Sequence, residues 1–242
     1  MILGTRGDKM NKTLPIGIIG AMDDEVKGLI SRLDDRCEKE ILGIKFYTGT
    51  VFSKPVVVAK CGVGKVFAAM CATVMMLEFN PRIIVNTGVG GALASDLECS
   101  DTVVAKRLVQ HDMDTSALGD EVGMISGINK VFFDADERAC DVLLSAAERL
   151  GIRARKGIIA SADRFVCTRE DKESIVAKFG ADVCEMEGAA IAHAAYVANT
   201  PFAVVRAISD GANEEAMLDF PAFLKVAVKN SEALTLEFIK EF

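Results

Sequence analysis

Short β-branched and apolar runs alternate with helix-like segments along most of the chain, and this alternation constrains the fold more than any other feature. Runs of four to eight such residues, bounded by glycine, proline or polar residues, are typical of buried strands. Alternating strands and helices predict a mainly parallel sheet covered by helices. We therefore expect one α/β domain over residues 14–242, with strands at 15–20, 44–51, 55–60, 83–86, 102–109, 157–161, 182–184 and 202–208.

Acidic and aromatic residues follow several of the predicted strands. Asp210 ends the run that begins at Phe202, Glu25 follows the first strand, and 185–187 follow the strand at 182–184. Ligands of open α/β sheets bind at the edge where the carboxyl ends of the strands lie. Together with Phe165, these carboxylates predict acid–base chemistry on a neutral, hydroxyl-bearing substrate with an aromatic portion. Turn formation and compensation of helix dipoles are the alternative roles for the same acidic residues.

Two glycine-rich segments, 61–65 and 87–92, follow strands and resemble nucleotide-binding loops only superficially. The first departs from phosphate-loop spacing, because Ala59 stands where the first glycine is needed and Val66 follows the lysine. The second lacks the third glycine of a dinucleotide fingerprint. We therefore expect no cofactor, and we interpret both as exits from strands where a ligand or another backbone segment approaches closely.

The composition argues against several classes of partner. The net charge is −7 without a basic stripe, so we expect neither nucleic acid nor a membrane as partner. The seven cysteines are scattered without a C-x-x-C pair, which is typical of reduced core cysteines in a cytoplasmic protein. Two distant histidines predict no metal site, and no apolar run reaches the ~18 residues of a transmembrane helix.

Three further segments stand out by composition. Residues 1–13 lack the apolar region of a secretory signal, and we interpret them as a flexible extension in which Met10 is an alternative start. The predicted helix 66–79 is apolar almost all round, so we expect it to be buried. The polar loop at 111–130 is long for a compact domain, which indicates a functional or interfacial role.

Helix ends are predicted from their capping residues. Asp134 and Thr168 are expected to cap the helices that follow them, and Gly180 to end the second of these. Asp219 is expected to cap the last helix, with Pro221 in its first turn.

Five motifs occur in an order that resembles a known family. They are Gly17-Ile18-Ile19-Gly20-Ala21-Met22 with Glu25, Gly62-Val63-Gly64-Lys65, Asn86-Thr87-Gly88, Glu185-Met186-Glu187 and Arg206-Ala207-Ile208-Ser209-Asp210. Together they resemble the bacterial 5′-methylthioadenosine/S-adenosylhomocysteine nucleosidases of the nucleoside phosphorylase superfamily, over about residues 15–240. The resemblance implies a single three-layer α/β/α domain with a central mixed, barrel-like sheet, in a homodimer without cofactor.

The resemblance also implies roles for three carboxylates in hydrolysis of an N-ribosidic bond. Asp210 is the general acid that shares a proton with adenine N7, Glu25 activates the water, and Glu187 accepts hydrogen bonds from the ribose hydroxyls. A free aspartic acid titrates near ~3.9, so a protonated Asp210 at neutral pH requires burial that raises its pKa by roughly three units, or about 4 kcal/mol.

The remaining site residues implied by the resemblance surround the nucleoside. Phe165 stacks on adenine, the backbone of Val166 reads the edge of the base, Met186 packs against the sugar, and Ser209 orients the acid. The expected binding residues also include Met22, Val63, Val89, Glu185 and Phe220. A packing role remains the alternative for Met22, Glu185 and Met186.

Two positions depart from the family pattern. Val89 stands where some members carry serine, so a side-chain hydrogen bond is absent there. In the loop after His111, family members often carry an aromatic residue that reaches into the partner's site, and Leu118 is the residue nearest to that position here. Both changes concern the 5′-substituent. The expected substrates are 5′-methylthioadenosine, S-adenosylhomocysteine and 5′-deoxyadenosine, which would place the enzyme in methionine salvage.

Three other functions remain open from the sequence. A purine nucleoside phosphorylase would need cations near the ribose to hold phosphate, whereas the first strand ends in Met-Asp-Asp-Glu. A futalosine hydrolase would share the fold and the carboxylates. A non-catalytic nucleoside-binding protein would keep Phe165 but would not need Glu25 together with Asp210.

Overall fold

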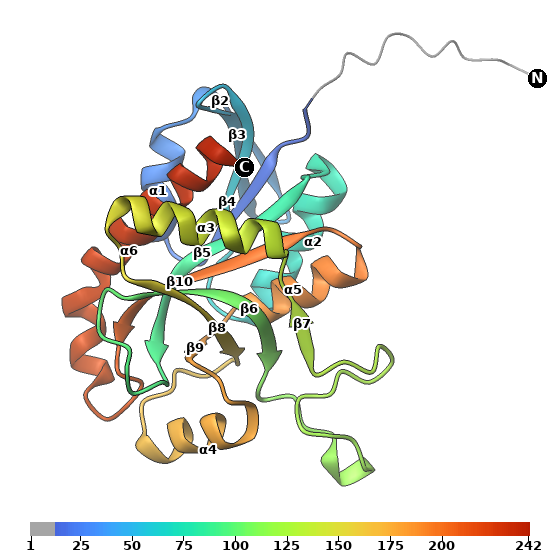
Figure 1. Cartoon of the computed structure of the whole chain (residues 1–242). Helices are drawn as coiled ribbons and strands as arrows, with labels where there is room; N and C mark the ends of the chain where they lie inside the picture. The colour runs from blue at the N-terminus through green and yellow to red at the C-terminus, as the bar shows by residue number, and fades with distance from the viewer. Residues whose placement is uncertain (1–12) are drawn as a thin grey trace, which may run out of the picture.

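The computed structural model describes residues 13–242, so the predicted extension at 1–13 lies almost entirely outside the described residues. Residues 13–242 contain ten strands and six α-helices (Figure 1). The strands are β1 Ile16–Gly20, β2 Asp34–Ile41, β3 Ile44–Val51, β4 Lys54–Lys60, β5 Ile83–Ala92, β6 Thr102–Gln110, β7 Phe132–Asp134, β8 Ala154–Ser161, β9 Val183–Glu185 and β10 Phe202–Asp210. The helices are α1 Asp23–Ser31, α2 Lys65–Phe79, α3 Glu137–Leu150, α4 Arg169–Phe179, α5 Gly188–Val197 and α6 Ala216–Glu241.

Five of the strands close into a ring. β10 pairs with both β5 and β6, β6 pairs with β8, β8 with β9, and β9 returns to β5. The β10–β6 and β9–β5 pairs are antiparallel and the other three are parallel. β1, β4, β3 and β2 extend the sheet from β5. The predicted central mixed, barrel-like sheet is confirmed.

Helices cover both faces of the sheet (Figure 1). Successive residues of a strand point to opposite faces, so one strand supplies apolar side chains to both cores. Ile16 and Ile18 of β1 pack in one apolar core with α1, α3 and α6. Ile19 of the same strand packs in a second core with α2 and α5. The three-layer α/β/α architecture is therefore confirmed as well.

The two longest barrel strands position the functional residues. Every residue of β5 and β10 is buried, as expected for strands covered on both faces. The prediction that 87–92 is a loop after the strand was wrong, since β5 continues through Ala92. Its glycines leave room for side chains that approach β5, and β10 pairs with it as far as Asp210 opposite Gly91.

Several boundary predictions need correction. The cap of α3 is Asp136, whose carboxylate accepts from Ala139 N, and not Asp134, which ends β7. α6 begins at Ala216, so Asp219 lies within its first turn and Pro221 inside the helix. Strands β2 and β7 were not predicted, because β2 is mostly charged and β7 has only three residues.

The predictions for α4 and α2 had opposite outcomes. The side chain of Thr168 caps α4 and Gly180 ends it in the left-handed conformation, as predicted. The expectation that α2 is buried all round was wrong, since Val66, Phe67 and Leu77 are 69%, 54% and 79% exposed. Among the described residues, no helix is both long and apolar enough to span a membrane.

Candidate active site

A cavity of about 490 Å³ opens where β1, β5, β9 and β10 end. Its lining contains every residue expected at the site: Met22, Glu25, Val63, Val89, Phe165, Val166, Glu185, Met186, Glu187, Ser209, Asp210 and Phe220. Ala21, Gly90, Gly91, Arg164, Cys184 and Met217 complete it. The structure therefore brings together in one cavity residues that lie up to about two hundred positions apart in the sequence.

Glu25 is held by backbone amides. Its Oε2 accepts from Ala21 N at 2.6 Å and Met22 N at 3.0 Å, and its Oε1 accepts from Val89 N at 3.1 Å. Burial raises the pKa of this carboxyl, while the charge of Arg206 and the three amide donors act in the opposite direction. The side chain is thus fixed in position and favours a bound proton more than a free glutamic acid does.

Glycine in β5 makes the position of Glu25 possible. A Cβ at Gly88 would lie 2.5 Å from Glu25 Oε1 and 3.1 Å from its carboxyl carbon. Gly91 has the same relation to the second carboxylate, since a Cβ there would lie 2.8 Å from Asp210 Oδ1. The glycines of β5 therefore provide space for carboxylates, which is the close approach expected at a strand glycine.

Asp210 lies at the end of β10 with both oxygens engaged. Ser209 Oγ donates to Oδ2 at 2.8 Å, and Ala212 N donates to Oδ1 at 2.9 Å. Burial is the largest influence on this carboxyl and raises its pKa, and the nearby charge of Asp219 acts in the same direction. The environment of Asp210 therefore favours a bound proton more than water does.

Glu187 lies between β9 and α5. Its Oε1 accepts from Gly64 N at 2.9 Å, which ties it to the loop before α2. Burial and the nearby charge of Glu185 raise its pKa to about 7, against the attraction of Arg206. The same loop is fixed by Asp163, whose Oδ1 accepts from Lys65 N at 2.7 Å.

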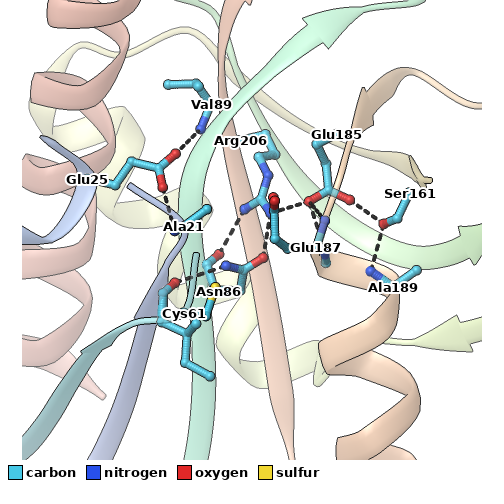
Figure 2. A network of polar contacts seen from close by, with 12 residues as sticks. Ala21, Glu25, Cys61, Asn86, Val89, Ser161, Glu185, Glu187, Ala189 and Arg206 are labelled. Atoms are coloured by element: carbon cyan, nitrogen blue, oxygen red, sulfur yellow. Dashed lines mark hydrogen bonds and ion pairs between the residues drawn. The ribbon is translucent and has the colours of Figure 1, made fainter. Parts of the chain in front are cut away.

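A buried guanidinium, that of Arg206, lies between Glu185 and Glu187 (Figure 2). Arg206, 1% exposed, donates to Glu185 Oε2 and Asn86 Oδ1, and its Nη2 lies 3.9 Å from Glu187 Oε2. Glu185 Oε2 also accepts from Glu187 N and Gly188 N, and its Oε1 accepts from Ser161 Oγ. Both oxygens of Glu185 are occupied by the protein, which favours the structural role over substrate binding.

Apolar side chains form the remaining walls. Phe165 is 41% exposed, and its ring meets that of Phe220 edge to face, at 5.9 Å between centroids and 84° between planes. An aromatic ring with one open face is suited to stacking against a planar base. Among residues 13–242, no group of three or more metal-binding side chains could hold a metal ion.

Known proteins are similar to this chain in sequence and fold. The phosphorylase superfamily model matches residues 15–240. A 5′-methylthioadenosine/S-adenosylhomocysteine nucleosidase of Oceanobacillus iheyensis is 37% identical over 229 residues, 94% of this chain and 100% of that protein. The chain belongs to this nucleosidase family of the phosphorylase superfamily. As a member, it is an N-glycosidase.

Solved structures agree with the assignment to the nucleosidase family. The nucleosidase of Neisseria meningitidis in complex with methylthio-immucillin-A has a TM-score of 0.92 and 32% identity, covering 95% of this chain and 100% of that one. Futalosine hydrolase of Helicobacter pylori has a TM-score of 0.91 and 35% identity, covering 95% and 98%. Two hydrolases named for different substrates therefore share the fold of this nucleosidase.

Sequence reasoning assigned no role to Arg206, Asn86 and Ser161, which organise the carboxylates of this nucleosidase. Arg206 interrupts an apolar β-branched run, and a lone charge in a strand buried on both faces requires a partner. That signal was available. The identity of its partners was not, because Asn86, Glu185 and Arg206 meet only through the pairing of β5, β9 and β10.

Proposed function

We propose that the protein hydrolyses the N-ribosidic bond of 5′-methylthioadenosine and S-adenosylhomocysteine, and also of 5′-deoxyadenosine, with release of adenine. The observation that carries the proposal is the meeting of Glu25, Glu187 and Asp210 in one cavity, each with a pKa raised by burial. Free thiols at all seven cysteines support a cytoplasmic setting, where methionine salvage would take place.

In the proposed reaction, Asp210 acts as the general acid. It donates its proton to N7 of the adenine, which leaves with the bonding electron pair as the C1′–N9 bond breaks. Ser209 fixes the carboxyl through its 2.8 Å hydrogen bond. The ring of Phe165 would stack on the base, and the backbone of Val166 would read its edge.

Glu25 and Glu187 act on the ribose side. Water attacks C1′ and gives a proton to Glu25, whose three amide contacts hold it in place for the approach. Glu187 accepts hydrogen bonds from the ribose hydroxyls, and its negative charge stabilises the positive charge that develops on the sugar. Met186 and Met22 pack against the sugar and the 5′-substituent.

The electrostatics of the cavity favour water over phosphate as the nucleophile. A phosphorylase needs a cation available to the incoming phosphate. Arg206 is already bound by Glu185 and lies beside Glu187, and Arg164 at the cavity lining is paired with Asp171. The Glu25 carboxylate repels a phosphate dianion.

An adenine-release assay in phosphate-free buffer tests the proposal. Wild-type protein should convert 5′-methylthioadenosine to adenine and free 5-methylthioribose at full rate without phosphate. Glu25→Gln should abolish turnover while nucleoside binding persists, because the base and ribose contacts lie elsewhere. The control is Asp24→Asn, which removes the adjacent carboxylate, partly exposed and paired with Lys27. A ribose 1-phosphate product would identify a phosphorylase.

Futalosine hydrolysis is the second candidate, favoured by the 35% identity to the Helicobacter pylori enzyme. It would use the same carboxylates on a nucleoside with a different base and 5′-substituent. Comparing kcat/KM for futalosine and 5′-methylthioadenosine separates the two, since a preference of tenfold or more, about 1.4 kcal/mol, identifies the better fit.

We also propose a homodimer. Helices α2 and α5 pack together, and both expose apolar side chains: Val66, Phe67, Met70 and Leu77 on α2, Tyr196 and Val197 on α5. Val66, Leu77 and Val197 line one shared hollow. An exposed apolar surface of this kind is typical of an interface between subunits. Leu118, 84% exposed in the long loop, would be available to a partner.

A further inference from the structure

Helix α4 connects the aromatic wall of the cavity to the proposed acid. Phe165 and Val166 lie three and two residues before its cap, Thr168, and Lys172 lies one turn into the helix. The ammonium of Lys172 reaches across to two strand ends, donating to Ala92 O at 2.7 Å and Gly211 O at 2.8 Å. Ala92 ends β5, and Gly211 directly follows Asp210.

The two carbonyls lie where the pairing between β5 and β10 stops. Asp210 opposite Gly91 is the last pair of that ladder, and the register shifts just before it. Beyond this point, Lys172 joins the two strands through its ammonium. Two charge-assisted hydrogen bonds to backbone carbonyls therefore restrain the segment that carries Asp210.

The same ammonium also acts electrostatically on the carboxyl. Burial has the largest effect on the pKa of Asp210 and raises it, as does the charge of Asp219 on α6, whereas the hydrogen bonds from Ala212 and Ser209 and the charge of Lys172 lower it. Cys184 on β9 and Cys99, before β6, are the other titratable groups that interact with Asp210. Burial in turn lowers the pKa of Lys172. Lys172 is the nearby cation that counteracts protonation of the acid.

We propose that Lys172 is a positioning residue for this reaction: its ammonium, bound to Ala92 O and Gly211 O, fixes the end of β10 and with it the direction of the Asp210 carboxyl towards the leaving base. The inference rests on the proposed function of Asp210. Arg169 N of the same helix contacts Glu214 Oε1 at 3.1 Å, so α4 binds the segment after β10 at a second point, which keeps the fold intact when Lys172 is changed.

The test compares Lys172→Met, Lys172→Gln and Lys172→Arg, with Lys178→Met as the control on the exposed side of α4. Met and Gln should lower kcat by about tenfold or more, as misplacement of a catalytic group does. Because Asp210 acts when protonated, activity falls as pH rises through its pKa. Removing the ammonium raises that pKa, so the alkaline limb of the kcat profile should move to higher pH. Arg should restore the limb, and Lys178→Met should leave it unchanged.

A second measurement does not depend on turnover. The pKa of Asp210 is followed by ¹³C NMR of the carboxyl carbon, assigned by its absence in Asp210→Asn, and should rise in Lys172→Met. The inference is overturned if neither the alkaline limb nor the carboxyl titration changes in Lys172→Met and Lys172→Gln. It is also overturned if Lys172→Arg shifts them as far as Lys172→Met does. Failure of wild type to release adenine would instead overturn the proposed function, with the NMR result still deciding the electrostatic effect.

Discussion

At the scale of single residues, burial decides what the carboxylates can do. Glu25, Glu187 and Asp210 are 7%, 7% and 2% exposed. Low exposure raises the free energy of the charged form. Amide, hydroxyl or guanidinium groups near each carboxylate reduce this cost. The balance differs among the three, since Glu187 and Glu25 interact with Arg206, whereas Asp210 has Ser209 and Lys172 nearby. These different partners suit the three carboxyl groups to the different roles proposed for them.

Asp210→Asn should lower kcat by roughly 10²- to 10⁴-fold, the usual effect of removing a general acid. The amide fits the same space but has no proton of suitable acidity for N7. Single-turnover assays of adenine release measure the effect, with circular dichroism to confirm the fold. Asp96→Asn, which changes an exposed carboxylate, is the control. A kcat within twofold of wild type would remove Asp210 from the mechanism.

At the scale of elements, the central strand β5 provides space. Because Gly88 and Gly91 lack side chains, α1 and β10 can bring Glu25 and Asp210 close to the backbone of β5. The same strand donates Val89 N to Glu25. β5 therefore shapes the site in two ways: its glycines leave space for the carboxylates, and its backbone donates a hydrogen bond to one of them.

Gly88→Ala should lower kcat by about 10²-fold, because the new Cβ would lie 2.5 Å from Glu25 Oε1 and displace the carboxylate. Nucleoside binding, measured by calorimetry, should change less than kcat. A double-mutant cycle with Glu25→Asp tests the route of the effect. The shorter carboxylate leaves room for the methyl group, so adding Gly88→Ala to it should cost much less. Additive losses would show that Gly88 acts independently of Glu25.

At the scale of the whole molecule, the site imposes a cost on stability. Carboxyl groups with raised pKa values bind more protons in the folded chain than in the unfolded chain. Folding stability attributable to these groups is therefore highest at low pH and falls as pH rises from the unfolded pKa through the folded one. The exposed apolar side chains of α2 and α5 also lower the stability of the monomer, because they remain in contact with water.

Glu187→Gln should remove part of this pH dependence. The pKa of Glu187 is raised from 4.5 to about 7, so wild type should lose stability relative to the variant between these pH values, by up to about 3 kcal/mol. Urea midpoints at pH 5 and pH 8 measure the difference. Glu40→Gln, an exposed change on β2, is the control and should leave the pH dependence unaltered. A difference in urea midpoint between variant and wild type that is the same at pH 5 and pH 8 would contradict a raised pKa of Glu187.

Leu77→Glu should dissociate the proposed dimer, because it would bury a charge in an apolar interface. Light scattering coupled to size-exclusion chromatography should give dimer mass for wild type and monomer mass for the variant. Leu150→Glu, at the end of α3, is the matched control and should remain dimeric. A wild type of monomer mass at all concentrations would disprove the dimer.

The elements that the sequence predicted correctly depend on local patterns, and the prediction of the three carboxylates used the same patterns. Apolar runs and caps such as Thr168 with Gly180 marked most elements, and strand ends marked Glu25, Glu187 and Asp210 as neighbours. The motif order also indicated the barrel-like sheet. Long-range pairing decided the rest: the continuation of β5 through its glycines, the exposed face of α2, and the partners of Arg206 and Lys172. Those features depend on which distant strands lie side by side, and hydrophobic periodicity does not encode that choice.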